Sequence, residues 1–151
     1  MKKEMPAPFR RPAALAAAIL AVLAWVVPAC PAAERKVVVY YFHTAYRCPT
    51  CRTLERLSRE AVSEGFAAEL ADGRLAFRSV DVTRPEDRHF VDDFRLYTKS
   101  LVLVEEGGPA PRWKNLARIW DLVREPAAFK HYVQQEVRTF LSKAGGSGGR
   151  P

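Results

Sequence analysis

The chain has few residues of the kinds that hold metal ions. A closed structural zinc site needs four ligands, usually two cysteine pairs or one pair with closely spaced histidines. Here Cys48 and Cys51 form a single pair, and the three histidines are scattered: His43, His89 and His131. This argues against structural zinc. His43 could still approach the cysteines, and two thiolates could bind a soft ion such as copper(I) or arsenite.

The sequence also lacks a glycine-rich turn between a strand and a helix. Such a turn holds the phosphates of dinucleotide cofactors. Its absence argues against a flavin- or nicotinamide-dependent enzyme that transfers hydride on its own. No internal repeat is present either, so a solenoid or repeat array is not expected.

A basic stripe is missing, although the formal net charge is +7. Residues 1–33 carry four basic residues and one acid, which leaves a net charge of +4 for the rest of the chain. In "RTLERLSREAVSE" arginines alternate with acids, as on a solvated surface. Nucleic acid is therefore not an expected partner.

Residues 1–33 have the pattern of an export signal. Four basic residues precede the uncharged apolar run Ala13 to Val27, and small residues follow in "PACPAA". A membrane-spanning helix needs roughly 20 apolar residues, so this run is short for a permanent anchor. We expect a removable signal, with a retained membrane anchor as the alternative.

Cys30 lies near the end of this leader and has two possible fates. Cleavage after Ala32 or Ala33 would remove it with the signal. Alternatively, "VPAC" is an imperfect lipoprotein box, and Cys30 would carry lipid. In both cases the mature chain keeps Cys48 and Cys51, an even number suited to an oxidising compartment. We expect a periplasmic protein, or one anchored to the membrane on its extracytoplasmic side.

The chain after the leader alternates between strand and helix patterns. "KVVVYYFH", residues 36–43, is continuously apolar and predicts a central strand buried on both faces. Strands alternating with helices imply parallel crossovers in a layered α/β domain, here over residues 34–142. The glycine-rich residues 143–151 read as a flexible tail. Further strands are expected at 73–82 and 100–108, and a loop or edge strand at 109–116.

Helical patterns connect these strands. In residues 51–64 apolar side chains recur at helical spacing opposite arginines and glutamates. Thr83 and Glu86 predict a capping box at the start of a second helix, residues 83–94. Further helices are expected at 117–123 and 126–141.

The cysteine pair lies where the buried strand gives way to a helix. As a crosslink, its four-residue loop would restrict the unfolded chain by only about 2 kcal/mol, so a purely structural role is a poor explanation. A helix N-terminus lowers the pKa of a thiol, and Arg47 adds positive charge, so Cys48 is the expected nucleophile. Pro49 suits the first helical turn. Cys51, one turn later and less exposed, is the expected resolving thiol.

The order of strand, Cys48-Pro49-Thr50-Cys51, helix, strand with Asp81, helix and strand resembles the thioredoxin superfamily over residues 36–142. The resemblance implies a three-layer α/β sandwich with a mixed central sheet flanked by helices. It also implies a redox-active disulfide between Cys48 and Cys51 with no other cofactor. The proline after the first cysteine resembles the glutaredoxin type of site.

Several segments are similar to a smaller group, the ArsF-type family named as a subunit of nitrophenyl-compound nitroreductases. They are "VVVYYFH", "RCPTCR", "HFVDDF", "TKSLVL" and "WKNLARIWDLV". This similarity implies an exported thioredoxin-like subunit that assists the reduction of nitroaromatic or organoarsenical compounds. Its partner would be a redox protein or a membrane-bound electron donor.

Two departures from ordinary thioredoxins concern the site. Their strand before the cysteines carries a buried acid, which "VVVYYF" lacks. They also have a cis-proline facing the cysteines, whose position here is matched by Lys99. Thr98 and Ser100 flank Lys99 and could contact an anionic substrate, or could belong to an ordinary solvated loop. The residues expected to shape the site are therefore Tyr46, Arg47, Pro49, Thr50, Thr98, Lys99 and Ser100.

Aromatic side chains could line a substrate pocket, although packing is their commoner role. The candidates are Trp113, Trp120, Tyr40, Tyr41 and Tyr46. Tyr46 is expected near the site because it lies beside the cysteines.

Three functions remain open from the sequence. The first is thiol-disulfide exchange or electron transfer through the cysteine pair. The second is binding of a soft metal or metalloid ion by the two thiolates without catalysis. The third is a noncatalytic scaffold in a membrane complex.

Overall fold

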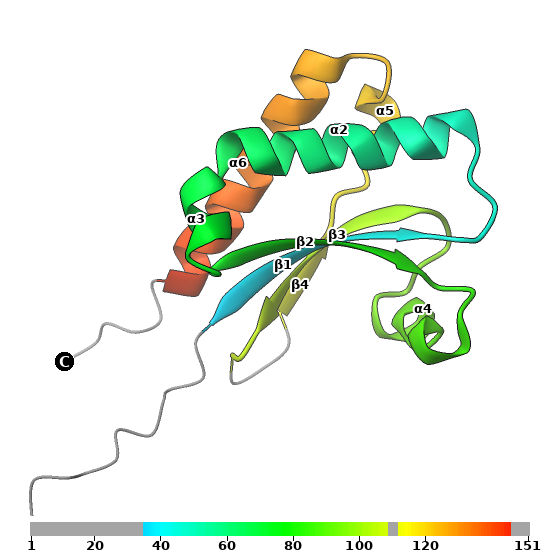
Figure 1. Cartoon of the computed structure of the whole chain (residues 1–151), viewed down its shortest axis with the longest axis horizontal. Coiled ribbons are helices and arrows are strands. Elements are labelled where there is room, and N and C mark those ends of the chain that lie inside the picture. The colour runs from blue at the N-terminus through cyan, green and yellow to red at the C-terminus, as the bar shows by residue number, and fades with distance from the viewer. Residues whose placement is uncertain (1–34, 109–111, 146–151) are drawn as a thin grey trace, which may run out of the picture. The chain divides into compact units, whose positions relative to one another are not determined.

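The structure is a computed structural model that describes residues 35–108 and 112–145 (Figure 1). The predicted export signal, the predicted lipid attachment at Cys30 and most of the predicted tail lie outside the described residues. Within the described part, no helix is long and apolar enough to cross a membrane.

A four-stranded mixed sheet forms the centre of the domain, in the order β2-β1-β3-β4. β1 (Lys36–His43) runs parallel to β2 (Leu75–Asp81) and antiparallel to β3 (Ser100–Glu106), which pairs antiparallel with β4 (Arg112–Asn115). The α/β class and the mixed sheet flanked by helices are thus confirmed, and Arg112–Asn115, within the segment predicted as a loop or edge strand, forms an edge strand of the described sheet.

β1 is buried on both faces, as its continuous apolar sequence predicted. Alternate side chains of a strand point to opposite faces of the sheet. Val39 and Tyr41 therefore join one core cluster, while Val38, Tyr40 and Phe42 join the other. Every β1 residue after Lys36 is buried.

The larger core lies under two long helices, α2 (Pro49–Gly65) and α6 (Pro126–Gly145), which pack together on one face of the sheet (Figure 1). The short helices α3 (Ala67–Ala71) and α5 (Ile119–Leu122) complete this layer. α6 continues to Gly145, slightly beyond the predicted boundary of the domain. The buried side chains of α2 and α6 include Leu54, Leu57, Ala61, Val62, Phe129, Val133, Val137 and Phe140.

Within the described part of the chain, the opposite face carries only short helical segments, and here one prediction was wrong. The predicted helix over 83–94 is a 3-10 turn, η2 (Pro85–Asp87), followed by α4 (Phe90–Asp93). Thr83 caps neither, because its backbone N–H and its hydroxyl both donate to Oδ1 of Asp81, at 2.9 and 2.6 Å. An aspartate that bonds the backbone two residues on forms a turn that competes with helix initiation.

Candidate active site

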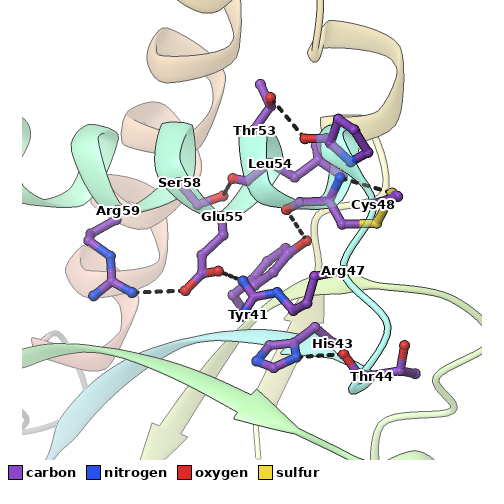
Figure 2. Close-up of polar contacts among 12 residues, drawn as sticks. Tyr41, His43, Thr44, Arg47, Cys48, Thr53, Leu54, Glu55, Ser58 and Arg59 are labelled. Carbon is purple, nitrogen blue, oxygen red and sulfur yellow. Dashed lines mark hydrogen bonds and ion pairs between the residues drawn. A yellow bond between two sulfur atoms is a disulfide. The ribbon is translucent and has the colours of Figure 1, made fainter.

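The two cysteines form a disulfide at the start of α2, with a Cα–Cα distance of 5.1 Å. Cys48 has extended backbone angles, φ −69° and ψ 161°, and Pro49 opens the helix. The Cys48 Sγ accepts a hydrogen bond of 3.2 Å from the Cys51 N–H (Figure 2). Cys48 therefore takes the place of a helix N-cap, with sulfur as the acceptor.

The two sulfur-bearing residues differ in exposure. Cys51 is 2% exposed, whereas Cys48 is half-buried. Pro49 and Thr50 between them are exposed, and Tyr46 just before them is 76% exposed. The disulfide is therefore accessible from the side of Cys48.

Arg47 turns toward α2 and forms an ion pair with Glu55 (Figure 2). Arg59 donates to the same carboxylate at 2.9 Å. The Arg47 Nε is buried without a hydrogen-bond partner among the described residues. The positive charge expected beside Cys48 is thus paired with Glu55, a carboxylate that Arg47 shares with Arg59.

Substitution Glu55→Gln is expected to raise the reactivity of Cys48 in the reduced protein. Without the carboxylate, the Arg47 charge is free to stabilise a neighbouring thiolate. Because Arg47 is partly exposed, solvent screening limits the effect to about a half-unit shift of the alkylation-rate profile toward lower pH. The rate of iodoacetamide alkylation against pH, in a Cys51→Ser background, measures it. Glu60→Gln, which removes a carboxylate paired with Arg56 and Lys130, should leave the profile in place; equal profiles for both variants would contradict the expectation.

Tyr41 is hydrogen-bonded to the backbone of the cysteine turn. It belongs to β1, is fully buried, and donates from its hydroxyl to the Cys51 carbonyl oxygen at 2.7 Å (Figure 2). Burial raises the pKa of Tyr41 to about 12, and the nearby charge of Arg47 opposes this. β1, which has no buried acid, thus places the neutral phenol of Tyr41 against the turn between Cys48 and Cys51.

Tyr41→Phe is expected to make the protein less sensitive to alkaline pH. The pKa of Tyr41 in the folded state lies above its ordinary value near 10. The contribution of the neutral, buried phenol to the free energy of unfolding is therefore complete below pH 10 and is lost as pH rises toward 12. For the wild type we expect a loss of about 1.4 kcal/mol by pH 11 from this residue. Urea unfolding at pH 8 and at pH 11 measures the difference. The control variant Tyr46→Phe should lose as much unfolding free energy between pH 8 and pH 11 as the wild type does. If Tyr41→Phe also lost as much, Tyr41 would not be the source of the alkaline sensitivity.

His43 lies at the end of β1 but does not assemble a metal site with the cysteines. Its Nδ1 is 3.0 Å from the Thr44 carbonyl oxygen, and its ring centroid is 6.1 Å from that of Tyr41. Among residues 35–108 and 112–145, no three histidine, cysteine, aspartate or glutamate side chains converge so as to hold a metal ion.

The segment Thr98 to Ser100 divides into an inner and an outer part. Ser100 is 4% exposed and its hydroxyl donates to the Thr98 carbonyl oxygen at 2.9 Å. The Trp120 Nε1 donates to the Lys99 carbonyl oxygen at 3.1 Å. Thr98 and Lys99 are among the residues that line an open cavity, whereas Ser100 is not.

A shallow hollow lies on the exposed side of the cysteine turn, between the first turn of α2 and α5. Its lining includes Pro49, Thr50 and Trp120. Trp120 therefore has two roles that its sequence context did not separate, lining this hollow and holding the backbone at Lys99. Trp113 lies elsewhere, with its ring edge-on to Phe94.

Comparison with known proteins gives limited similarity. No protein-family model matches the chain, and no curated protein matches it. A thioredoxin from Thermus thermophilus shares 21% identity, with 61% of this chain and 74% of that chain covered and a TM-score of 0.34. A solved structure of a malarial protein shares 14% identity over 60% of this chain and 96% of that one, also with a TM-score of 0.34. What the structure establishes is an α/β domain with a CxxC-spaced disulfide at the start of a helix.

Proposed function

We propose that the protein is a thioredoxin-like thiol-disulfide exchange protein in which Cys48 attacks and Cys51 resolves. The observation that carries the proposal is the disulfide at the N-terminus of α2, with Cys48 half-buried and Cys51 2% exposed. The order of strand, cysteine pair, helix, strand, helix and strand supports it, because this is the order on which the sequence resemblance rests.

The exchange needs no group beyond the two thiols and a substrate disulfide. The thiolate of reduced Cys48 attacks one substrate sulfur, and the other sulfur leaves with the electron pair and takes a proton. The Cys51 thiolate then attacks the Cys48 sulfur, which forms the intramolecular disulfide and releases the second substrate thiol. Two electrons pass to the substrate. The Cys51 N–H that donates to Cys48 Sγ also suits the thiolate of the reduced form.

The setting of this chemistry is proposed from the sequence. The leader pattern supports export to the periplasm, with either a removed signal or a lipid or membrane anchor. The partner would be a redox protein or a membrane-bound electron donor. A narrower role, as an accessory subunit in the reduction of nitroaromatic or organoarsenical compounds, rests on the segments similar to the ArsF-type family.

A redox titration of the mature chain tests the exchange function. After equilibration in thiol-disulfide buffers and alkylation, mass spectrometry counts the free thiols at each potential. We expect a two-electron transition between about −120 and −300 mV, the range from catalytic oxidoreductases to structural disulfides. No transition in this range would rule out exchange. Stoichiometric arsenite or copper(I) binding in its place, lost in a Cys48→Ser/Cys51→Ser variant, would indicate a metal or metalloid carrier.

A further inference from the structure

A cavity of about 260 Å³ lies at the carboxyl end of β1. Its apolar floor consists of Phe42, Val82, Val91 and Leu96. Pockets for drug-sized ligands usually measure about 300–1,000 Å³. This cavity is therefore of a size to hold a single ring with a small substituent.

The cavity is separate from the disulfide. Phe42 and Leu96 belong to the core cluster on the α4 face of the sheet, whereas α2 packs on the other face (Figure 1). None of the residues that line the cavity comes from α2. His43 at the end of β1 and Thr44 in the connection to Cys48 also line it, so the cavity lies at the same end of β1 as the disulfide, although neither cysteine lines it.

The mouth of the cavity is polar and carries positive charge. Lys99 supplies an ammonium group and Thr98 a hydroxyl, while no aspartate or glutamate lines the cavity. The Thr44 hydroxyl donates to the Tyr46 carbonyl oxygen at 3.1 Å and is not counted as a donor. An ammonium group and a hydroxyl at one mouth can together bind a carboxylate through charge-assisted hydrogen bonds. The charge therefore favours an anion over a cation.

The floor favours an aromatic ring. The Phe42 ring lies 5.2 Å from that of Phe90 and 5.5 Å from that of Phe94, between centroids. Phe42 is 1% exposed because this cluster encloses it, so the apolar surface open to a ligand comes from the half-buried Val82 and Val91 and from Tyr97. An aromatic ligand placed there can pair with the Tyr97 ring. Tyr97 lines the same cavity with 94% of its surface exposed, so a large aromatic side chain is available beside a bound ring.

We propose that this cavity binds a compact aromatic monocarboxylate, with its ring against Val82 and Val91 beside Tyr97 and its carboxylate at Lys99 and Thr98. The site goes beyond the exchange function, because no cysteine takes part in it. Binding then occurs in the oxidised protein and persists when both cysteines are replaced.

Binding is measured by NMR on the isotope-labelled, oxidised mature chain, with benzoate as the probe. We expect saturable amide shifts at Thr44, Val82, Val91 and Thr98, with a Kd on the order of millimolar, as for other very small ligands. Benzamide, acetate and cyclohexanecarboxylate remove the charge, the ring and the aromaticity in turn. Each should bind more weakly than benzoate, benzamide by about tenfold.

Two lysine variants make the assignment specific. Lys99→Gln should weaken benzoate about tenfold and leave benzamide unchanged, because it removes only the charged donor. Lys143→Gln, at the exposed end of α6, is the matched control and should bind benzoate as the wild type does. Cys48→Ser/Cys51→Ser should also retain binding, which keeps this test independent of thiol exchange.

Four results would overturn the proposal. The first is an absence of shifts at the cavity in a folded protein at about 10 mM benzoate. Equal binding of benzamide would mean an apolar cavity without anion selectivity, and equal binding of acetate would mean a surface charge only. Equal binding of cyclohexanecarboxylate would remove the preference for an aromatic ring.

Discussion

A Cys51→Ser variant is expected to lose turnover and to accumulate as a mixed disulfide with its substrate through Cys48. The Cys51 sulfur is already within bonding distance of Cys48, so its attack on the intermediate is intramolecular. Replacing it leaves only external thiols, which act at their bulk concentration. Because intramolecular attack has a very high effective molarity, turnover should fall by at least about 100-fold.

Mass spectrometry of the reaction with a disulfide-linked peptide measures this intermediate directly. The expected product is a one-to-one adduct that reductant removes and that maps to Cys48. In the matched Cys48→Ser variant we expect no adduct, because Cys51 is 2% exposed. Adducts through Cys51, or turnover near the wild-type rate in Cys51→Ser, would reverse or remove the assigned roles.

Leu54→Ala is expected to destabilise the protein by about 2–5 kcal/mol, the usual cost of a large-to-small change in a core. Leu54 is fully buried in the larger core cluster, and it lies in α2 just after Cys51. Truncation removes apolar contact between the sheet and the helix that positions the cysteines. Urea unfolding of the oxidised protein measures the loss as a lower midpoint at an unchanged slope.

Arg52→Ala is the control for this experiment. Arg52 is exposed in the same part of α2, and alanine keeps the helix propensity high, so its effect should stay within about 0.5 kcal/mol. A loss below about 1 kcal/mol in Leu54→Ala would show that this part of α2 contributes little to folding.

The central strand and the first helix could be predicted because each has a strong local pattern. β1 is apolar at nearly every position and can only be buried on both faces. α2 has an apolar stripe at helical spacing, and Pro49 fits its first turn. The place of the cysteine pair between them followed from these two elements.

The predicted helix over 83–94 was wrong for a local reason. The sequence contains two competing signals for Thr83, and it does not show which of them dominates. Thr83 followed three residues later by Glu86 fits a capping box, yet Asp81 offers Thr83 a competing acceptor at the end of β2. Deciding between the two requires knowledge of where β2 ends. Strand ends are set by tertiary pairing, here with β1.

The polar contacts around the cysteines could not be read from the sequence because they join separate elements. Tyr40 and Tyr41 are adjacent and chemically alike, but only Tyr41 points toward α2 and reaches Cys51. Glu55 meets Arg47 because the loop before Cys48 folds back on the helix. The cavity likewise combines residues from both sides of α4, and their meeting depends on the path of the chain.

The edges of the sheet bear on how another protein can approach this one. Edge strands with unpaired backbone groups can recruit a foreign strand, and charged side chains on short strands hinder this. β4 has four residues and includes Arg112 and Lys114. On β2, the other edge of the described sheet, Arg78 instead turns back to donate to the Tyr40 hydroxyl at 3.2 Å. Association by sheet extension is therefore disfavoured at β4. Under the proposed function, a partner that exchanges with Cys48 is expected to recognise the N-terminus of α2 and its adjoining loop.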